Sequence, residues 1–135
     1  MLASRWTNPG RPAGPAVECT VLATKLPLRY HRDVPRFLRC GLGVRRQLSR
    51  TPGLVGYSVA LQLLDRTLWT VSAWTDRREL ARFDRSGAHR AAKDLLRAAL
   101  RPSVLVLWTC PVSQLPVGWP EVRRRVAEAV PDRAA

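Results

Sequence analysis

Two apolar segments run almost without interruption from residue 54 to residue 75, and they constrain the fold more than any other part of the chain. LVGYSVALQLL and TLWTVSAWT are rich in β-branched and aromatic residues, which favour extended strands. Only Asp65 and Arg66 lie between the two apolar segments, and this short polar step predicts a turn. Because strands joined by a short turn pair with each other, the segment predicts an antiparallel hairpin.

A helix and a strand are predicted on each side of the hairpin. Apolar residues recur every three or four positions in the helical segments, whereas the strands are continuous and β-branched. These flanking elements are a strand over 17–28, a helix between Asp33 and Pro52, a helix between Asp76 and Pro102, and a strand over 103–111. The order β-α-β-β-α-β predicts an α+β, ferredoxin-like fold, in which a four-stranded antiparallel sheet carries two helices on one face.

The chain of 135 residues divides into one domain and two ends. The ferredoxin-like α+β domain is expected over 17–111, and 46% hydrophobic residues suffice for its core. Residues 1–16 are rich in proline, glycine and polar residues, which predicts a disordered leader. Residues 112–135 form a C-terminal extension in which GWPEVRRRVAEAV has the apolar spacing of a short helix.

The last predicted strand is apolar on both of its faces. Successive side chains of a strand point to opposite sides of the sheet. One side of this strand carries Val104, Val106 and Trp108, and the other carries Leu105 and Leu107. Since two helices can cover only one face, the sequence predicts that a second sheet covers the other face and that the protein is a homodimer, sheet against sheet.

The net charge of +13 comes from 23 lysines and arginines against 10 acidic residues. Such a surface favours anionic partners, nucleic acid among them. The arginines, however, are spread along both helices, the hairpin and the tail, and exposed aromatics are not interleaved with them. Nucleic-acid binding therefore ranks below small-molecule binding.

The expected cellular location follows from the cysteines and the apolar runs. Three cysteines without CxxC spacing suggest free thiols, and no run reaches the ~20 apolar residues of a membrane span. The N-terminal residues also lack the apolar core of a signal peptide. The sequence therefore predicts a cytoplasmic protein that does not enter membranes.

The junction between the hairpin and the second helix carries a family resemblance. Trp74, Leu80, Phe83, Ser86 and His89 follow the spacing W-x5-L-x2-F-x2-S-x2-H. This pattern resembles that of the antibiotic-biosynthesis-monooxygenase-like proteins of the dimeric α+β barrel superfamily, and about 40 residues carry the resemblance. It implies a dimeric α+β barrel, and for members with known chemistry it implies cofactor-free oxidation of phenolic or quinol-type molecules in an apolar cavity.

The resemblance and the strand geometry together nominate the site residues. His89 is the candidate catalytic base, because an imidazole titrates near neutral pH. Tyr57, Trp74, Phe83 and Trp108 are the candidate walls of the substrate pocket. No clustered metal ligands or phosphate-binding loop occur in the sequence, so neither a metal nor a cofactor is expected.

Three functions remain open at this point. The first is a cofactor-independent, monooxygenase-like enzyme that acts on an aromatic or quinol-type small molecule. The alternative is a non-catalytic ligand-binding or structural homodimer of the same fold. The third is a nucleic-acid-binding protein that uses its basic surface.

Overall fold

The computed structural model describes residues 2–8, 17–48, 50–51, 53–84 and 102–129. Its strands are β1 (Leu2–Ala3), β2 (Glu18–Pro27), β3 (Leu54–Gln62), β4 (Thr67–Trp74) and β5 (Val104–Pro111). Its helices are α1 (Val34–Leu48), α2 (Arg77–Asp84) and α4 (Trp119–Ala129), with short 3-10 turns η1 (His31–Asp33) and η3 (Val112–Gln114). The sheet is antiparallel throughout, in the order β1-β3-β4-β2-β5.

The predicted α+β, ferredoxin-like fold is confirmed. Four strands follow the expected order, and the short strand β1 adds to the edge of β3. The hairpin turns over residues 63–66, where the sequence predicts it. Arg66 there has a φ of 53°, in the left-handed region that glycine usually occupies.

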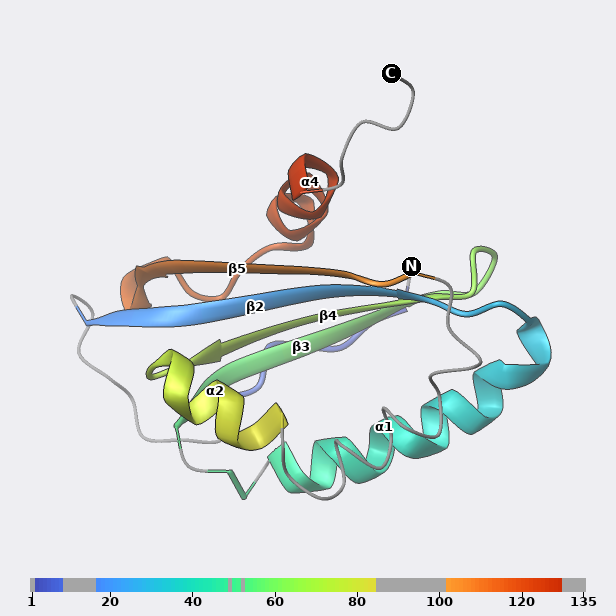
Figure 1. Cartoon of the computed structure of the whole chain (residues 1–135), viewed down its shortest axis with the longest axis horizontal. Coiled ribbons are helices and arrows are strands. Elements are labelled where there is room, and N and C mark those ends of the chain that lie inside the picture. The colour runs from blue at the N-terminus through green and yellow to red at the C-terminus, as the bar shows by residue number, and fades with distance from the viewer. Residues whose placement is uncertain (1, 9–16, 49, 52, 85–101, 130–135) are drawn as a thin grey trace.

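The helices α1 and α2 lie on one side of the sheet, and α4 lies on the other (Figure 1). Beneath α1, Phe37 packs with Leu28 and Leu61. Beneath α2, Phe83 packs with Leu54 and Trp74. Asp76 begins α2 by accepting a hydrogen bond from the Glu79 amide at 2.9 Å, which satisfies one of the free N–H groups of the first turn.

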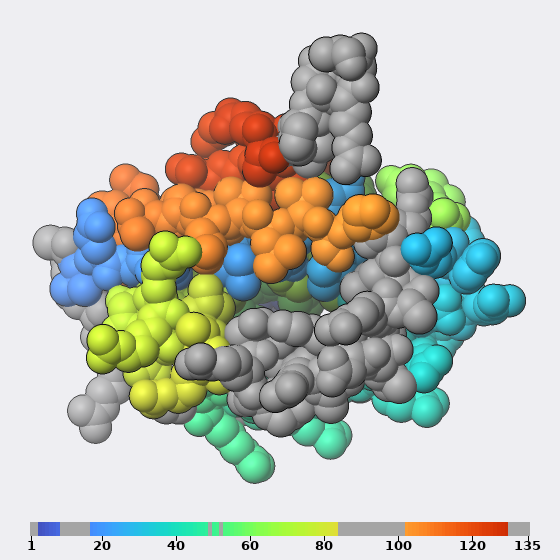
Figure 2. Space-filling view, in the orientation of Figure 1, coloured from blue at the N-terminus to red at the C-terminus, as the bar shows by residue number. Residues whose placement is uncertain are grey.

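The second face of the sheet is covered by the chain itself. Val122 and Val126, four residues apart on α4, are 0% and 2% exposed and pack against the side chains of Val21 and Ala23 with the rest of this core. In the space-filling view α4 rests directly above β5 (Figure 2). We expected a partner's sheet on this face, whereas the apolar stripe of α4 occupies it over β2 and β5 in the single chain.

Residues 2–8 run along β3 rather than forming part of a disordered leader. The Ser4 and Thr7 amides donate to the carbonyls of Val59 and Tyr57 at 2.8 and 2.9 Å. A free strand edge offers unpaired N–H and C=O groups, and this segment satisfies some of those on β3. The disordered leader was predicted over 1–16, but residues 2–8 are ordered against β3. Residues 9–16 lie outside the described ranges.

The indole of Trp6 holds this N-terminal segment against Gly56. A Cβ at Gly56 would overlap the indole, with Nε1 as the nearest atom. We expect Gly56→Ala to lower the free energy of unfolding by ~1–3 kcal/mol, as overpacked sites do, and to raise protease cleavage within residues 2–8. Chemical denaturation and limited proteolysis measure the two effects.

The matched control is Gly118→Ala, because a Cβ at Gly118 would lie at an ordinary 3.7 Å from Pro120. In a Trp6→Ala background the Gly56→Ala penalty should disappear, since the overlapping ring is gone. An equal penalty with and without Trp6 would show that Gly56 is required for another reason.

Candidate functional site

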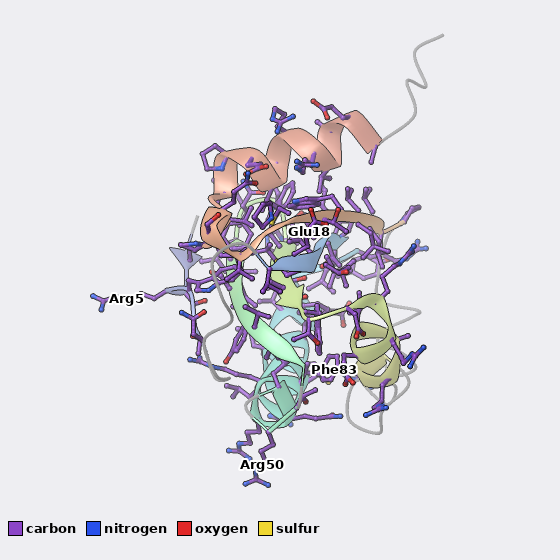
Figure 3. The ribbon with its side chains drawn as sticks, turned by 90° about the vertical axis from the view of Figure 1, so that its left-hand side faces the viewer. Arg5, Glu18, Arg50 and Phe83 are labelled. Carbon is purple, nitrogen blue, oxygen red and sulfur yellow. The ribbon has the colours of Figure 1, made fainter. Side chains whose placement is uncertain are left out.

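Tyr57, Trp74 and Phe83 meet on the face of the sheet that α1 and α2 cover. They come from β3, β4 and α2, and they are 5%, 1% and 6% exposed. The ring centroids of Trp74 and Phe83 are 5.2 Å apart, with planes tilted by 33°. This separation is typical of favourable aromatic pairs. Figure 3 shows Phe83 on the side of α2 that faces the sheet and α1.

The local sequence fixes the orientation of Trp74. It is the last residue of β4 and lies opposite Leu54 of β3 in the register. Its indole N–H donates to the Ser72 hydroxyl at 2.9 Å, so that the polar edge of the ring is satisfied while its faces remain in apolar contact. The cap at Asp76 then starts α2 at once, which brings Phe83 back over the Trp74 ring.

Three of the four predicted wall residues therefore lie together, and Trp108 does not join them. Trp108 belongs to the core on the opposite face, with Val106 and Cys110. The guanidinium of Arg125 on α4 lies 4.3 Å from the centroid of its ring, a cation–π contact. The strand β5 thus presents Trp108 to α4, away from Tyr57 and Trp74. His89, the candidate base, lies outside the described residues.

Glu79, on the same helix as Phe83, carries a buried polar atom that sequence reasoning missed. Its Oε2 atom is buried and has no hydrogen-bond partner among the described residues, although Arg82 lies 3.6 Å away as an ion-pair partner. The aliphatic part of the Glu79 side chain packs so closely on Gly53 that a Cβ there would overlap the Cβ and Cγ atoms of Glu79. Asp76 and Glu79 form the D-x-x-E spacing of a helix start, and this signal could have drawn attention to Glu79.

The described residues contain no group of three or more histidines, cysteines, aspartates or glutamates that could hold a metal ion. The side chains around Trp74 are apolar, apart from the hydroxyls of Tyr57 and Ser72. Mostly apolar walls with a few polar groups are the composition typical of small-molecule sites. None of the helices in the described ranges is both long and apolar enough to cross a membrane.

Comparison with solved structures identifies the fold. No family model and no curated protein sequence matches the chain. A conserved protein from Methanosarcina mazei Go1 aligns with a TM-score of 0.62 at 17% identity, covering 70% of this chain and 94% of its own. A putative antibiotic biosynthesis monooxygenase from Nitrosomonas europaea aligns with a TM-score of 0.59 at 15% identity, covering 66% and 95%.

SnoaB from Streptomyces nogalater, described as a cofactor-independent oxygenase, is also similar. It aligns with a TM-score of 0.59 at 20% identity, over 76% of this chain and the whole of SnoaB. At such identities the likeness concerns the fold. Together with the strand order and the two helices on one face, it shows that this chain has the same ferredoxin-like fold as these antibiotic biosynthesis monooxygenase and oxygenase structures.

Proposed function

We propose that this protein is a monooxygenase-like enzyme that oxidises an aromatic or quinol-type small molecule with dioxygen and without a cofactor. The observation that carries the proposal is the structural likeness to SnoaB, a cofactor-independent oxygenase that aligns over its full length. The cluster of Tyr57, Trp74 and Phe83 supports it, because three rings from three elements suit the flat face of an aromatic substrate.

This reaction requires only a few groups from the protein. A base removes a proton from an acidic C–H of an anthrone-type substrate, and the resulting anion gives an electron to dioxygen. The two radicals then join to form a C–O bond, and loss of water leaves a ketone, so that CH₂ and O₂ become C=O and H₂O. The site has to bind the substrate, hold its oxygen atom by a hydrogen bond and accept one proton.

Two residues are proposed for the proton step. His89 is supported by its place in the sequence pattern and by the titration range of imidazole. Glu79 is supported by its buried carboxylate oxygen on α2, the helix that also carries Phe83. Tyr57 is proposed to donate a hydrogen bond to a substrate oxygen, and Trp74 and Phe83 to form the apolar floor.

The test is oxidation of an anthrone under air, followed by absorbance of the quinone product and by oxygen uptake. We expect turnover above buffer for the wild type and for His31→Ala, the matched histidine control. His31 lies in an exposed loop contact with the Leu63 carbonyl, away from the aromatic cluster. His89→Ala should lower kcat by about 100-fold or more, the usual contribution of a general base.

Oxidation no faster than in buffer alone would refute the oxygenase proposal. Equal rates in the wild type and His89→Ala would remove His89 from the mechanism, and a loss in Glu79→Gln would then assign the base to Glu79. Tight binding of the anthrone without turnover would favour the alternative, a non-catalytic ligand-binding protein. The near-complete burial of Tyr57 and Trp74 favours the remaining possibility, a structural protein of the same fold, since both rings are almost fully covered in the single chain.

We also infer that the protein forms a homodimer, with α4 exchanged between the two copies. A sheet-to-sheet interface requires the apolar face that α4 covers in the single chain. Exchange of α4 would keep Val122 and Val126 buried, in this case against the partner's sheet, and would join the two copies through their helices instead of through a direct sheet-to-sheet contact. Light scattering at micromolar concentration tests the dimer, and a monomeric mass would exclude it.

A further inference from the structure

A cleft of about 940 Å³ opens on the α4 side of the sheet, at one end of the strands. Five segments surround it: the end of β2, the β3–β4 turn with the end of β3, the start of β4, the start of β5 and α4. In Figure 1 the β3–β4 turn marks this end, at the right of the sheet. The volume is within the ~300–1,000 Å³ that small-molecule sites occupy.

Trp69 forms the base of the cleft between two cations. The Lys25 ammonium lies 5.4 Å from the centroid of its ring, and the Arg123 guanidinium lies 5.7 Å from it. The indole N–H donates to the Gln62 side chain at 2.8 Å, which fixes the ring. Since Trp69 is only 5% exposed, its role is to hold the two cations at the cleft rather than to stack on a ligand.

Positive charge exceeds negative charge among the described residues that line the cleft. Lys25, Arg66 and Arg123 line it against one carboxylate, that of Asp65. Among the residues that the structure describes, none of these three cations forms an ion pair. Arg66 uses its Nε to donate to the Leu28 carbonyl at 3.3 Å, which leaves its two terminal nitrogens for a ligand.

Arg123 differs from its neighbouring arginines on α4 in having no carboxylate partner among the described residues. Arg124 lies beside Arg123 in sequence but outside the cleft, and it pairs with Glu128 at 3.0 Å. Arg125 pairs with Glu121 at 3.1 Å. The helix therefore supplies carboxylate partners to its other arginines, and it leaves Arg123 facing the cleft without one.

The uncharged lining combines the polar side chains of Gln62, Thr67 and Ser103 with a larger number of apolar ones. The apolar lining comes from β2, the turn and the start of β5, with Pro27, Leu64, Pro102, Val104 and Leu105. A ligand that matches both parts has an anionic head and an apolar body. Because the cations and the apolar walls line the same cleft, one molecule of modest size can contact both.

We propose that this cleft binds an organic anion, with its carboxylate or phosphate group between Lys25 and Arg123 and its apolar body against the start of β5. The site is on the opposite face of the sheet from Tyr57, Trp74 and Phe83, so it is separate from the proposed oxygenase site. Bound ligand also joins α4 to β2, because its two principal partners come from these two elements.

Isothermal titration with four probes tests the proposal: 1-naphthoate, 1-naphthyl phosphate, inorganic phosphate and the uncharged 1-naphthalenemethanol. We expect one of the naphthyl anions to bind at least about 10-fold more tightly than both the uncharged probe and inorganic phosphate. The tighter of the two anions identifies the head group as carboxylate or phosphate. Lys25→Gln and Arg123→Gln should each weaken that binding by about 10-fold or more, as expected for a charge-assisted contact.

Arg124→Gln is the matched control, since it removes the same charge one residue away, outside the cleft, and should leave the affinity within about two-fold. Lys25→Arg keeps the charge and should keep most of the binding, which guards against a folding defect in Lys25→Gln. An equal loss in Arg124→Gln would assign the binding to the general positive field and overturn the proposal. Equal affinity for the charged and uncharged naphthyl probes, or no binding at millimolar concentration, would overturn it as well.

Discussion

Val122→Asp is expected to lower the free energy of unfolding by more than about 3 kcal/mol, because it places a carboxylate in a site with no exposed surface. Val122 packs in the core between α4 and the sheet, with Val21 and Val71. An ionised group cannot stay there without a partner, so α4 is expected to leave the sheet. Urea denaturation measures the loss, and hydrogen exchange should show that the amides of α4 lose protection.

The control for this substitution is Ala127→Asp, on the exposed side of the same helix. It introduces the same charge and should change stability by less than about 0.5 kcal/mol. Equal stability of the two variants would mean that α4 does not pack on the sheet in solution. Loss of α4 also uncovers apolar side chains of β2 and β5, so Val122→Asp should self-associate through that face at concentrations where Ala127→Asp does not.

The order of the elements could be predicted from the sequence because each type of element has its own period. The apolar steps of three and four residues in α1 include Val34, Phe37 and Val44, all of which pack on the sheet. The same pattern also included Leu38, which is 44% exposed. It lies at the flank of the apolar stripe, where the period alone does not separate covered from uncovered positions.

The partners of Trp108 could not be predicted, because alternation assigns faces within a strand but does not relate one strand to another. The register relates them. Val21 of β2 pairs with Ala73 on one side and with Trp108 on the other. Trp108 therefore shares a face with Ala73, whereas Trp74, one residue further, points to α2. A pairing shifted by one residue would have placed the two tryptophans together.

The position of α4 could not be predicted from the sequence either. The spacing of Val122 and Val126 predicts an amphipathic helix, but both faces of the sheet are apolar and either could receive it. The connection through η3 and Leu115 decides the matter, since it carries the chain from the end of β5 onto the face opposite α1 and α2. The covering of this face by Trp6 depends on Gly56, which a sequence marks only as a glycine in a strand.

Cys19 and Cys110 should make the stability fall at alkaline pH. Their sulfur atoms lie 3.9 Å apart across the β2–β5 pair, and both are buried. Burial, with a smaller contribution from the neighbouring Cys110, raises the pKa of Cys19 from 9.0 to about 12. Burial also raises the pKa of Cys110. The folded state therefore holds these protons more tightly than the unfolded chain does.

The direction of the effect follows from this order of the pKa values. The contribution of Cys19 is complete below about pH 9, the unfolded value, and it is lost as the pH rises toward about 12, the folded value. The full loss approaches ~4 kcal/mol, and between pH 8 and pH 10.5 it amounts to ~2 kcal/mol. Over this interval, the unfolding free energy of Cys19→Ala should therefore fall by ~2 kcal/mol less than the unfolding free energy of the wild type. The control is Cys40→Ala, which removes a partly exposed thiol on α1 and should keep the pH dependence of the wild type. If Cys19→Ala also kept the pH dependence of the wild type, Cys19 would not hold its proton more tightly in the folded protein than in the unfolded chain.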